Sequence, residues 1–179
     1  MTSATQSLRG MVYASMFGAL TAIGAYIIIP LPPVPITLQT LFLNLAAALL
    51  GGSLGALSQV IYILLGVIGL PVFAGGKAGL GVLFGPTGGY LIGFVVAAYV
   101  VGKLISIKKN PGLVWTVSVM LAGMVIIYAL GILQLTMVAK LSAQKAFAVG
   151  ALPFIPGDIV KIALAALVYL RVRDKIKVR

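Results

Sequence analysis

The chain has 179 residues, of which 61% are hydrophobic and only 8% are charged, whereas about 25% of the residues in soluble domains carry charge. No charged residue lies between Arg9 and Lys77, between Lys77 and Lys103, or between Lys109 and Lys140. Each interval exceeds the roughly 18 apolar residues that indicate a membrane-spanning helix. The composition excludes an ordinary soluble domain and predicts an all-α integral membrane protein with several crossings.

Charge and residue types narrow the function further. The formal net charge is +11, but the basic residues flank apolar segments instead of forming a stripe, so membrane topology explains them and no nucleic-acid partner is expected. Cysteine and histidine are absent, which removes the commonest metal ligands and the commonest general base. The sequence therefore predicts neither a metal site nor an enzyme.

Proline, glycine and charged residues divide the chain into six predicted transmembrane helices within one domain, residues 1–179. The predicted spans are 11–29, 36–50, 54–70, 87–102, 113–138 and 158–169. The second and the sixth are shorter than the roughly 20 residues of an ideal span, so we expect tilt or boundary errors of a few residues.

Six crossings place both termini on one side of the membrane, and the basic residues follow this division. That side holds Arg9, Lys103, Lys108, Lys109, Arg171, Arg173, Lys175, Lys177 and Arg179. The opposite side holds only Lys77, Lys140 and Lys145, with Lys161 just inside the last span. By the positive-inside rule, both termini are predicted to be cytoplasmic.

Two external connections are unusual for membrane-protein loops. Residues 30–35 contain four prolines and are expected to be extended and stiff, and residues 71–86 combine five glycines with apolar side chains. Irregular apolar backbone at a membrane surface has to fold over protein or line a cavity. We therefore expect these loops to form a lid or a wall.

The most informative charges are Asp158 and Lys161, an acid and a base at i and i+3 where an apolar span begins. They share one helix face. Ionisable groups within spans each cost at least ~2.5 kcal/mol, so they usually face the bundle interior and carry function. The pair predicts a ligand site; alternatively, Asp158 caps the helix while Lys161 pairs with it or extends outward.

A second candidate lies in the glycine-rich loop. Lys77 could attract an anionic group, and Gly75 and Gly76 would let the backbone approach it closely; a solvated loop lysine is the alternative. Other polar residues in or near spans could contact ligand, although most are expected to bridge helices. They are Thr37, Gln39, Thr40, Asn44, Gln59 and Gln134.

The first span carries small residues at a spacing of four, namely Ala14, Gly18 and Ala22. Such a face lets another helix approach closely. It predicts either a flat docking surface for a partner subunit or internal packing, and the spacing alone does not separate the two.

Two segments together resemble one protein family. The segments are GGKAGLGVLFGPTGGYLIGF, residues 75–94, and LPFIPGDIVK, residues 152–161. They resemble the BioY family, the biotin-specific S components of energy-coupling factor (ECF) transporters. The resemblance covers nearly the whole chain in length, helix count and loop placement, and its motifs are more specific than six apolar helices.

This resemblance implies a six-helix S-component bundle in a bacterial cell membrane, with biotin as ligand and no cofactor. Asp158 would accept a hydrogen bond from a ureido N–H, and Lys161 would donate to a polar oxygen of biotin. Lys77, or the Gly75 and Gly76 backbone, would lie near the valerate carboxylate. By position alone, Gln39 and Tyr90 are further candidates.

The resemblance also implies partners. In these families an alanine-rich motif on the first helix docks against the transmembrane coupling subunit, and here Gly18 replaces one alanine. That subunit and a pair of ATPases would supply the energy, while lipid surrounds the bundle. The rival hypotheses are a small proton-coupled transporter that uses Asp158, an intramembrane enzyme, and an assembly subunit without a small ligand.

Overall fold

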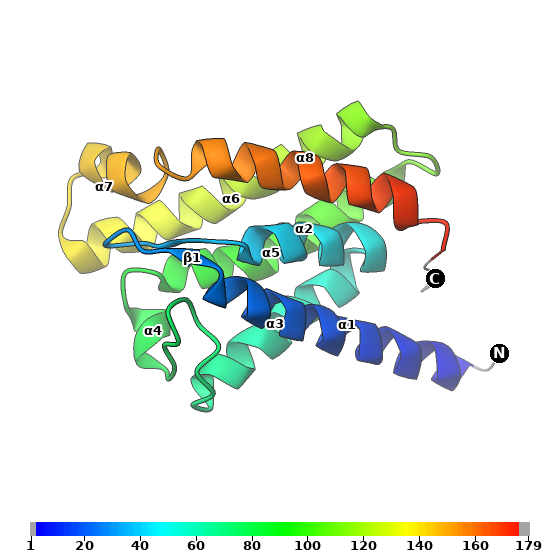
Figure 1. The fold of residues 1–179 in the computed structure, drawn as a ribbon, viewed down its shortest axis with the longest axis horizontal. Helices are drawn as coiled ribbons and strands as arrows, with labels where there is room; N and C mark the ends of the chain where they lie inside the picture. Colours follow the sequence, from blue (N-terminus) through cyan, green and yellow to red (C-terminus); the bar gives the residue numbers. More distant parts are fainter. Residues whose placement is uncertain (1–2, 176–179) are drawn as a thin grey trace.

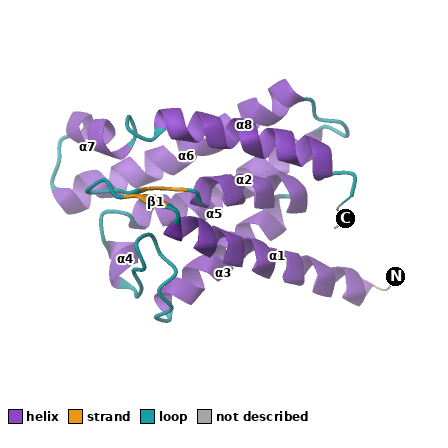
Figure 2. Cartoon of the chain, viewed as in Figure 1, coloured by secondary structure: helices purple, strands orange, loops and turns teal. Residues whose placement is uncertain are grey.

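The computed structural model describes residues 3–175, so Lys177 and Arg179 lie outside the described residues. Within them the chain forms eight helices and one two-stranded hairpin (Figures 1 and 2). The helices are α1 (Ser3–Tyr26), α2 (Gln39–Leu50), α3 (Gly52–Val67), α4 (Gly81–Phe84), α5 (Gly88–Ile107), α6 (Leu113–Ala139), α7 (Ala143–Gly150) and α8 (Ile155–Val172). The hairpin joins β1 (Ile28–Ile29) to β2 (Ile36–Thr37).

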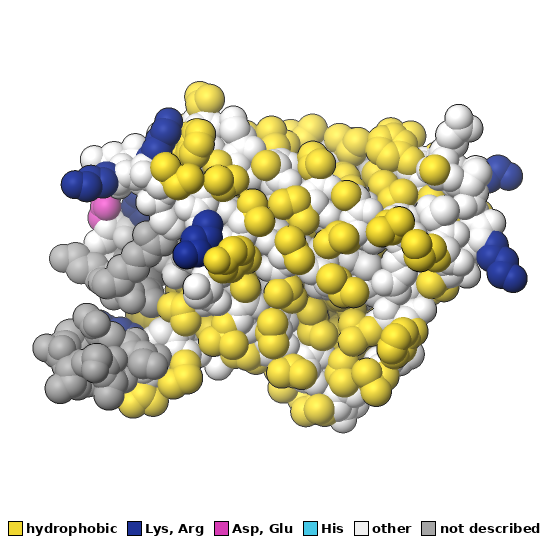
Figure 3. Space-filling view, turned by 180° about the vertical axis from the view of Figure 1, so that it is seen from behind, with side chains coloured by type: hydrophobic (Ala, Val, Ile, Leu, Met, Phe, Trp, Pro, Cys, Tyr) yellow, Lys and Arg dark blue, Asp and Glu magenta, His cyan; other side chains and the backbone are white. Residues whose placement is uncertain are grey.

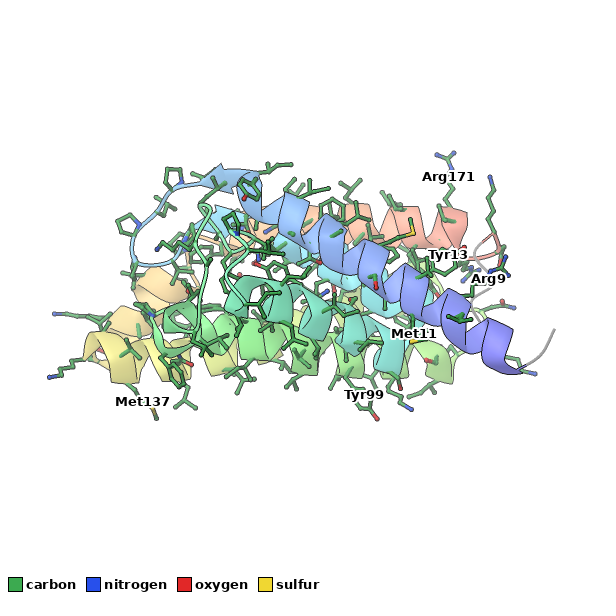
Figure 4. All side chains as sticks on the ribbon, turned by 90° about the horizontal axis from the view of Figure 1, so that it is seen from below. Arg9, Met11, Tyr13, Tyr99, Met137 and Arg171 are labelled. Carbon is green, nitrogen blue, oxygen red and sulfur yellow. The ribbon has the colours of Figure 1, made fainter. Side chains whose placement is uncertain are left out.

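The long helices form one bundle with two different ends. The beginning of α1 and the end of α8 lie at one end, together with the α2–α3 and α5–α6 turns (Figure 1). The hairpin, α4 and α7 lie at the opposite end. Arg9 and Arg171 accordingly lie at the end away from Met137 (Figure 4). This arrangement agrees with the predicted grouping of the termini and the basic residues; that this end faces the cytoplasm stays a prediction.

Three helices are long and apolar enough to cross a membrane: α1 from Leu8 onward, α5 and α6. Helices α7 and α8 meet at a bend of 51°, and they form a fourth membrane-spanning segment if the two are counted as one broken span. The apolar helices α2 and α3 are shorter, with 12 and 16 residues. On the face drawn in Figure 3, hydrophobic side chains cover the middle, and most of the lysine and arginine side chains lie toward the two ends. The membrane fold is thus clear, whereas the count of six spans stays a prediction.

The structure corrects several predicted boundaries. The first helix ends at Tyr26 and not at residue 29, because Ile28 and Ile29 pair with Thr37 and Ile36 in the hairpin. The loop 71–86 contains the short helix α4, and α7 was not predicted. The last helix begins at Ile155, three residues earlier than expected.

Glycines bring the helices of the bundle close together. A Cβ atom added at Gly93 of α5 would lie 2.9 Å from the Cα atom of Ile127 in α6. One added at Gly102 would lie 2.4 Å from the backbone of Gly51, at the α2–α3 turn. Small residues at such crossings permit backbone contact in membranes, where water does not drive helices together. These contacts place α5 between α6 and the α2–α3 pair, around the cavity described below.

The small-residue face of α1 packs inside this chain. Ala14 is fully buried, Ala22 is nearly so, and a Cβ atom added at Gly18 would lie 3.0 Å from the carbonyl oxygen of Ser58 in α3. In the structure these three residues therefore pack internally, which is the alternative to a docking surface for a partner subunit. Other positions of α1, including Ser15 and Ala19, are exposed.

Candidate ligand-binding site

A cavity of about 710 Å³ lies where the hairpin, the 71–86 loop and the helices α2, α5, α6 and α8 meet. Part of this volume is open to the surroundings of the molecule. The polar residues that line it are Thr37, Gln39, Thr40, Lys77, Thr87, Tyr90, Tyr128, Asp158 and Lys161. The two predicted charges of α8 therefore face the same cavity as Lys77.

The remaining wall of the cavity is apolar. It is formed by Val34, Pro35, Phe73, Ala74, Val82, Leu91, Phe94, Ile127 and Phe154. An apolar wall with a few placed polar groups binds the body of a ligand by burial and fixes its orientation by hydrogen bonds. The expectation that both external loops form a wall agrees with Val34 and Pro35 from one loop and Phe73 from the other.

Asp158 and Lys161 form a buried ion pair. The Nζ atom of Lys161 lies 2.5 Å from Oδ1 of Asp158, and the two residues are only 8% and 5% exposed. Thr40 donates a hydrogen bond to Oδ1 of Asp158 at 3.0 Å, and the hydroxyl of Tyr128 donates to Oδ2. A buried ion pair is tolerated when further hydrogen bonds satisfy its groups, and here α2 and α6 supply them to α8.

The geometry of α8 decides between the alternatives for this pair. The residue that caps the helix is Phe154, and Asp158 lies inside the first turn with its side chain on Thr40, Tyr128 and Lys161. Helix capping by Asp158 is therefore wrong, although its charge still lies near the positive end of the helix dipole. Lys161 is buried and does not extend outward; the expectation that it pairs with Asp158 is correct.

Lys161 also reaches a second group of polar side chains. It donates to the carbonyl oxygen of Thr37 at 2.9 Å. The Thr37 hydroxyl donates to Oε1 of Gln39 at 2.8 Å, and Nε2 of Gln39 donates to the hydroxyl of Tyr62 at 2.6 Å. This chain of hydrogen bonds joins α8 to the hairpin, α2 and α3. It orients the ammonium group before a ligand is present.

The 71–86 loop is attached to the bundle through an aromatic contact. Phe73 is almost completely buried, and its ring stands edge-on to Tyr62 at a centroid distance of 5.6 Å. The ring fills the space above Gly66, where a Cβ atom would lie 2.2 Å from it. The backbone of Phe73 pairs with Lys77, and Tyr26 donates to the carbonyl oxygen of Pro71. One wall of the cavity is thus a loop whose base is fixed by packing.

The other sequence candidates fall into two groups. Lys77 is exposed and lines the cavity, whereas Gly75 and Gly76 are next to it in the loop without lining the cavity themselves. Their φ angles of 73° and 72° explain why glycine is used there. Gln39 and Tyr90 do line the cavity, and the Tyr90 hydroxyl donates to the carbonyl oxygen of Gly150 at 2.8 Å.

Sequence reasoning missed Tyr128 and assigned Thr40 mainly to helix bridging. Both donate to the carboxylate of Asp158, so they belong to the site itself. Thr40, Tyr128 and Asp158 also line a smaller cavity of about 250 Å³, together with Asn44. A general signal was available for Thr40, because a buried carboxylate needs nearby donors; nothing in the sequence distinguished Tyr128 from tyrosines that only pack.

The cavity wall has two parts, a helix side and a loop side. The helix side consists of Thr40, Tyr128, Asp158 and Lys161, which lie on α2, α6 and α8. The loop side consists of Val34, Pro35, Phe73, Ala74 and Lys77, which lie on the two external loops.

Over residues 3–175, the fold and the site define a class: a helical membrane bundle with a buried ion pair in a largely apolar cavity, which is a candidate small-molecule site. Comparison with known proteins specifies the family. The sequence model of the BioY family matches residues 1–178. The biotin transporter BioY of Thermotoga maritima is 45% identical, over 93% of this chain and 96% of the relative. The chain belongs to the BioY family.

Two further matches agree. The biotin transporter BioY of Rhizobium etli is 44% identical over 90% of this chain and 91% of its own length. A crystal structure of the S-component for biotin from an ECF-type ABC transporter superposes with a TM-score of 0.88, at 29% identity, and covers 97% of this chain and 95% of that one. The expected S-component fold is therefore confirmed, and the chain is a transport protein of this class.

Proposed function

We propose that this chain is the biotin-binding S component of an ATP-driven ECF-type vitamin importer. The observation that carries the proposal is the buried Asp158–Lys161 pair in a cavity whose remaining wall is mainly apolar. Biotin matches this distribution, because it combines a polar ureido ring, an apolar thiophane ring and alkyl chain, and one carboxylate. The names of the relatives support the same ligand.

In the proposed complex, the helix side recognises the ureido ring. Asp158 accepts a hydrogen bond from a ureido N–H, and Lys161 donates to the ureido oxygen. In the structure both oxygens of Asp158 already accept hydrogen bonds, and Lys161 donates to Thr37. Oδ1 of Asp158 contacts both Thr40 and Lys161, whereas Oδ2 accepts from Tyr128 and has a second lone pair for a ureido N–H. An ammonium group has three donors, and Lys161 directs two of them to Asp158 and Thr37, so the third can reach the ureido oxygen.

The loop side receives the other end of the ligand. Phe73, together with Phe94 of α5, packs against the thiophane ring and the alkyl chain. Lys77 is exposed and has no carboxylate within ion-pair distance among the described residues, so it attracts the valerate carboxylate. Gln39 and Tyr90 complete the wall between the two ends.

Transport requires partners that this chain lacks. The proposed complex contains a transmembrane coupling subunit and a pair of ABC-type ATPases, in a bacterial cell membrane with both ends of this chain in the cytoplasm. Because Ala14, Gly18 and Ala22 are buried against the rest of the bundle, the docking face is assigned to the exposed side of α1. There Ser15 and Ala19 form a small-residue pair one turn apart.

The docking assignment is tested by placing a large side chain on each face of α1. Ala19→Trp is expected to leave biotin binding unchanged while it abolishes co-purification with the coupling subunit and biotin uptake. Ala14→Trp overfills an internal contact and is expected to lower thermal stability and binding together. Normal uptake by folded Ala19→Trp protein would exclude this face of α1.

Ligand binding is tested by isothermal titration calorimetry on the purified chain alone, with biotin, desthiobiotin and thiamine as ligands. We expect tight binding of biotin and none of thiamine. Desthiobiotin keeps the ureido ring and the carboxylate but lacks the thiophane sulfur, so its binding reports the apolar wall. Absence of binding in demonstrably folded protein would contradict the proposal and leave proton-coupled transport through Asp158 to be tested by collapsing the proton gradient.

A further inference from the structure

The α5–α6 turn carries two adjacent lysines, Lys108 and Lys109, at the end of the bundle that holds the chain termini. The sequence contains only two acidic residues, Asp158 and Asp174. Asp158 pairs with Lys161, and Asp174 lies 3.9 Å from Arg173. Both lysines are exposed and have no carboxylate within ion-pair distance in the described residues. Within residues 3–175, no acidic side chain balances the charge of these two lysines.

Trp115 fixes the position of one of these lysines. The ammonium of Lys108 lies 4.3 Å from the centroid of the Trp115 ring, which is a cation–π arrangement. The indole N–H of Trp115 donates to the carbonyl oxygen of Leu104 at 3.3 Å, so the ring connects the start of α6 to the end of α5. The ammonium is held beside the helices and does not extend freely into solvent.

Apolar side chains adjoin these lysines at the same turn. Ile107 is 70% exposed, Val114 is 80% exposed and Leu113 is 46% exposed. In membrane proteins, tryptophan is enriched at the boundary between headgroups and acyl chains, because its ring has an apolar body and a polar N–H. The exposed side chains of Ile107 and Val114, close in sequence to two lysines without an acidic partner among the described residues, match the two chemical halves of one lipid molecule.

We propose that the α5–α6 turn binds an anionic phospholipid, with the headgroup phosphate on Lys108 and Lys109 and the acyl chains against Ile107 and Val114. Charge complementarity selects this occupant, because juxtamembrane lysines are attracted to anionic lipids at the cytoplasmic surface. The site would anchor this end of the bundle at the membrane surface. It lies outside the ligand cavity and does not depend on which ligand the cavity binds.

The chain supplies its own reporter for this site, because Trp115 is its only tryptophan. The protein is reconstituted in vesicles of unmodified phosphatidylcholine. A second lipid with brominated acyl chains is added, which is either phosphatidylglycerol or phosphatidylcholine. Bromine quenches tryptophan fluorescence on contact, so quenching measures which lipid occupies the positions next to Trp115. We expect phosphatidylglycerol to quench at a several-fold lower mole fraction than phosphatidylcholine, and raised salt to reduce this preference.

Variants then locate the preference. Lys108→Gln/Lys109→Gln is expected to abolish it, whereas Lys140→Gln/Lys145→Gln, which removes two exposed lysines at the opposite end, keeps it. Equal quenching by the two lipids in the unmodified protein would overturn the proposal, and this arm needs no variant to fold. A preference that survives in the first variant, or that both variants lose equally, would also overturn it.

Discussion

The two sides of the cavity wall differ in how their polar groups are held. On the helix side, Asp158 accepts hydrogen bonds from two other helices and pairs with Lys161, and both charged residues are buried. On the loop side, Lys77 is exposed beside two glycines with positive φ angles. Groups on rigid elements recognise a ligand with more precision than groups on loops, whereas loops can move to admit it. The helix side is therefore expected to set affinity, and the loop side to set access.

The largest effect is expected from Lys161→Met on the helix side. The substitution removes a donor to the ligand and leaves the carboxylate of Asp158 buried without its cation. Loss of a charge-assisted contact worth about 1.5–3 kcal/mol weakens biotin binding by at least roughly 10-fold. Breaking a buried pair also lowers the free energy of unfolding by roughly 3–5 kcal/mol. Calorimetric titration and thermal unfolding measure the two effects.

A double variant separates recognition from folding. Asp158→Asn/Lys161→Met removes both charges with little change in volume, and replacing a whole buried pair by uncharged groups costs far less than breaking it. We expect thermal stability to recover while biotin binding stays weak. Recovery of binding together with stability would mean that the pair only supports the fold.

A smaller effect is expected from Tyr128→Phe, also on the helix side. The substitution keeps the ring in the cavity wall and removes the hydroxyl that donates to Asp158. A hydrogen bond to a charged group is worth about 1.5–3 kcal/mol, and Tyr128 acts on the ligand only through Asp158, so less than this is lost and biotin affinity falls by roughly fivefold. Tyr99→Phe is the matched control, because Tyr99 is exposed and is not part of the cavity wall. Equal affinities of the two variants would remove Tyr128 from the site.

The smallest effect is expected from Lys77→Gln on the loop side. An exposed charge contributes little to affinity and acts mainly by steering an anionic ligand, so the association rate falls by a few-fold at low salt and converges with the unmodified protein at high salt. Stopped-flow binding measures this rate. Lys145→Gln, on α7 outside the cavity wall, is the control. A loss of affinity as large as that of Lys161→Met would contradict the division between the two sides.

The sequence predicted the parts of the site that are costly to place in a membrane. Asp158 and Lys161 stand out because charges are rare in apolar spans, and the two loops stand out because apolar irregular backbone needs a protein surface to cover. Tyr128 could not be identified in this way, because the buried tyrosines Tyr62 and Tyr169 occur in equally apolar helices. Only the three-dimensional structure brings its hydroxyl to Asp158.

The sequence also predicted most, but not all, of the helices. The six predicted segments overlap α1, α2, α3, α5, α6 and α8. Helix α7 was not predicted, because its sequence mixes polar and apolar residues over only eight positions. A signal for it existed, since Ser142 caps this helix by accepting from the backbone N–H of Lys145. On α1, the spacing of Ala14 and Gly18 correctly indicated a close approach, but not that the approaching partner is α3.

We expect the buried pair of Asp158 and Lys161 to recognise the ligand and the loop side to govern access. This expectation is tested most directly by calorimetric titration of biotin into the unmodified chain, Asp158→Asn and Lys77→Gln, each shown to be folded by thermal unfolding. We expect affinity to be at least roughly 10-fold weaker for Asp158→Asn and nearly unchanged for Lys77→Gln, because only the former loses a buried charged contact. Unchanged affinity of folded Asp158→Asn protein would contradict it.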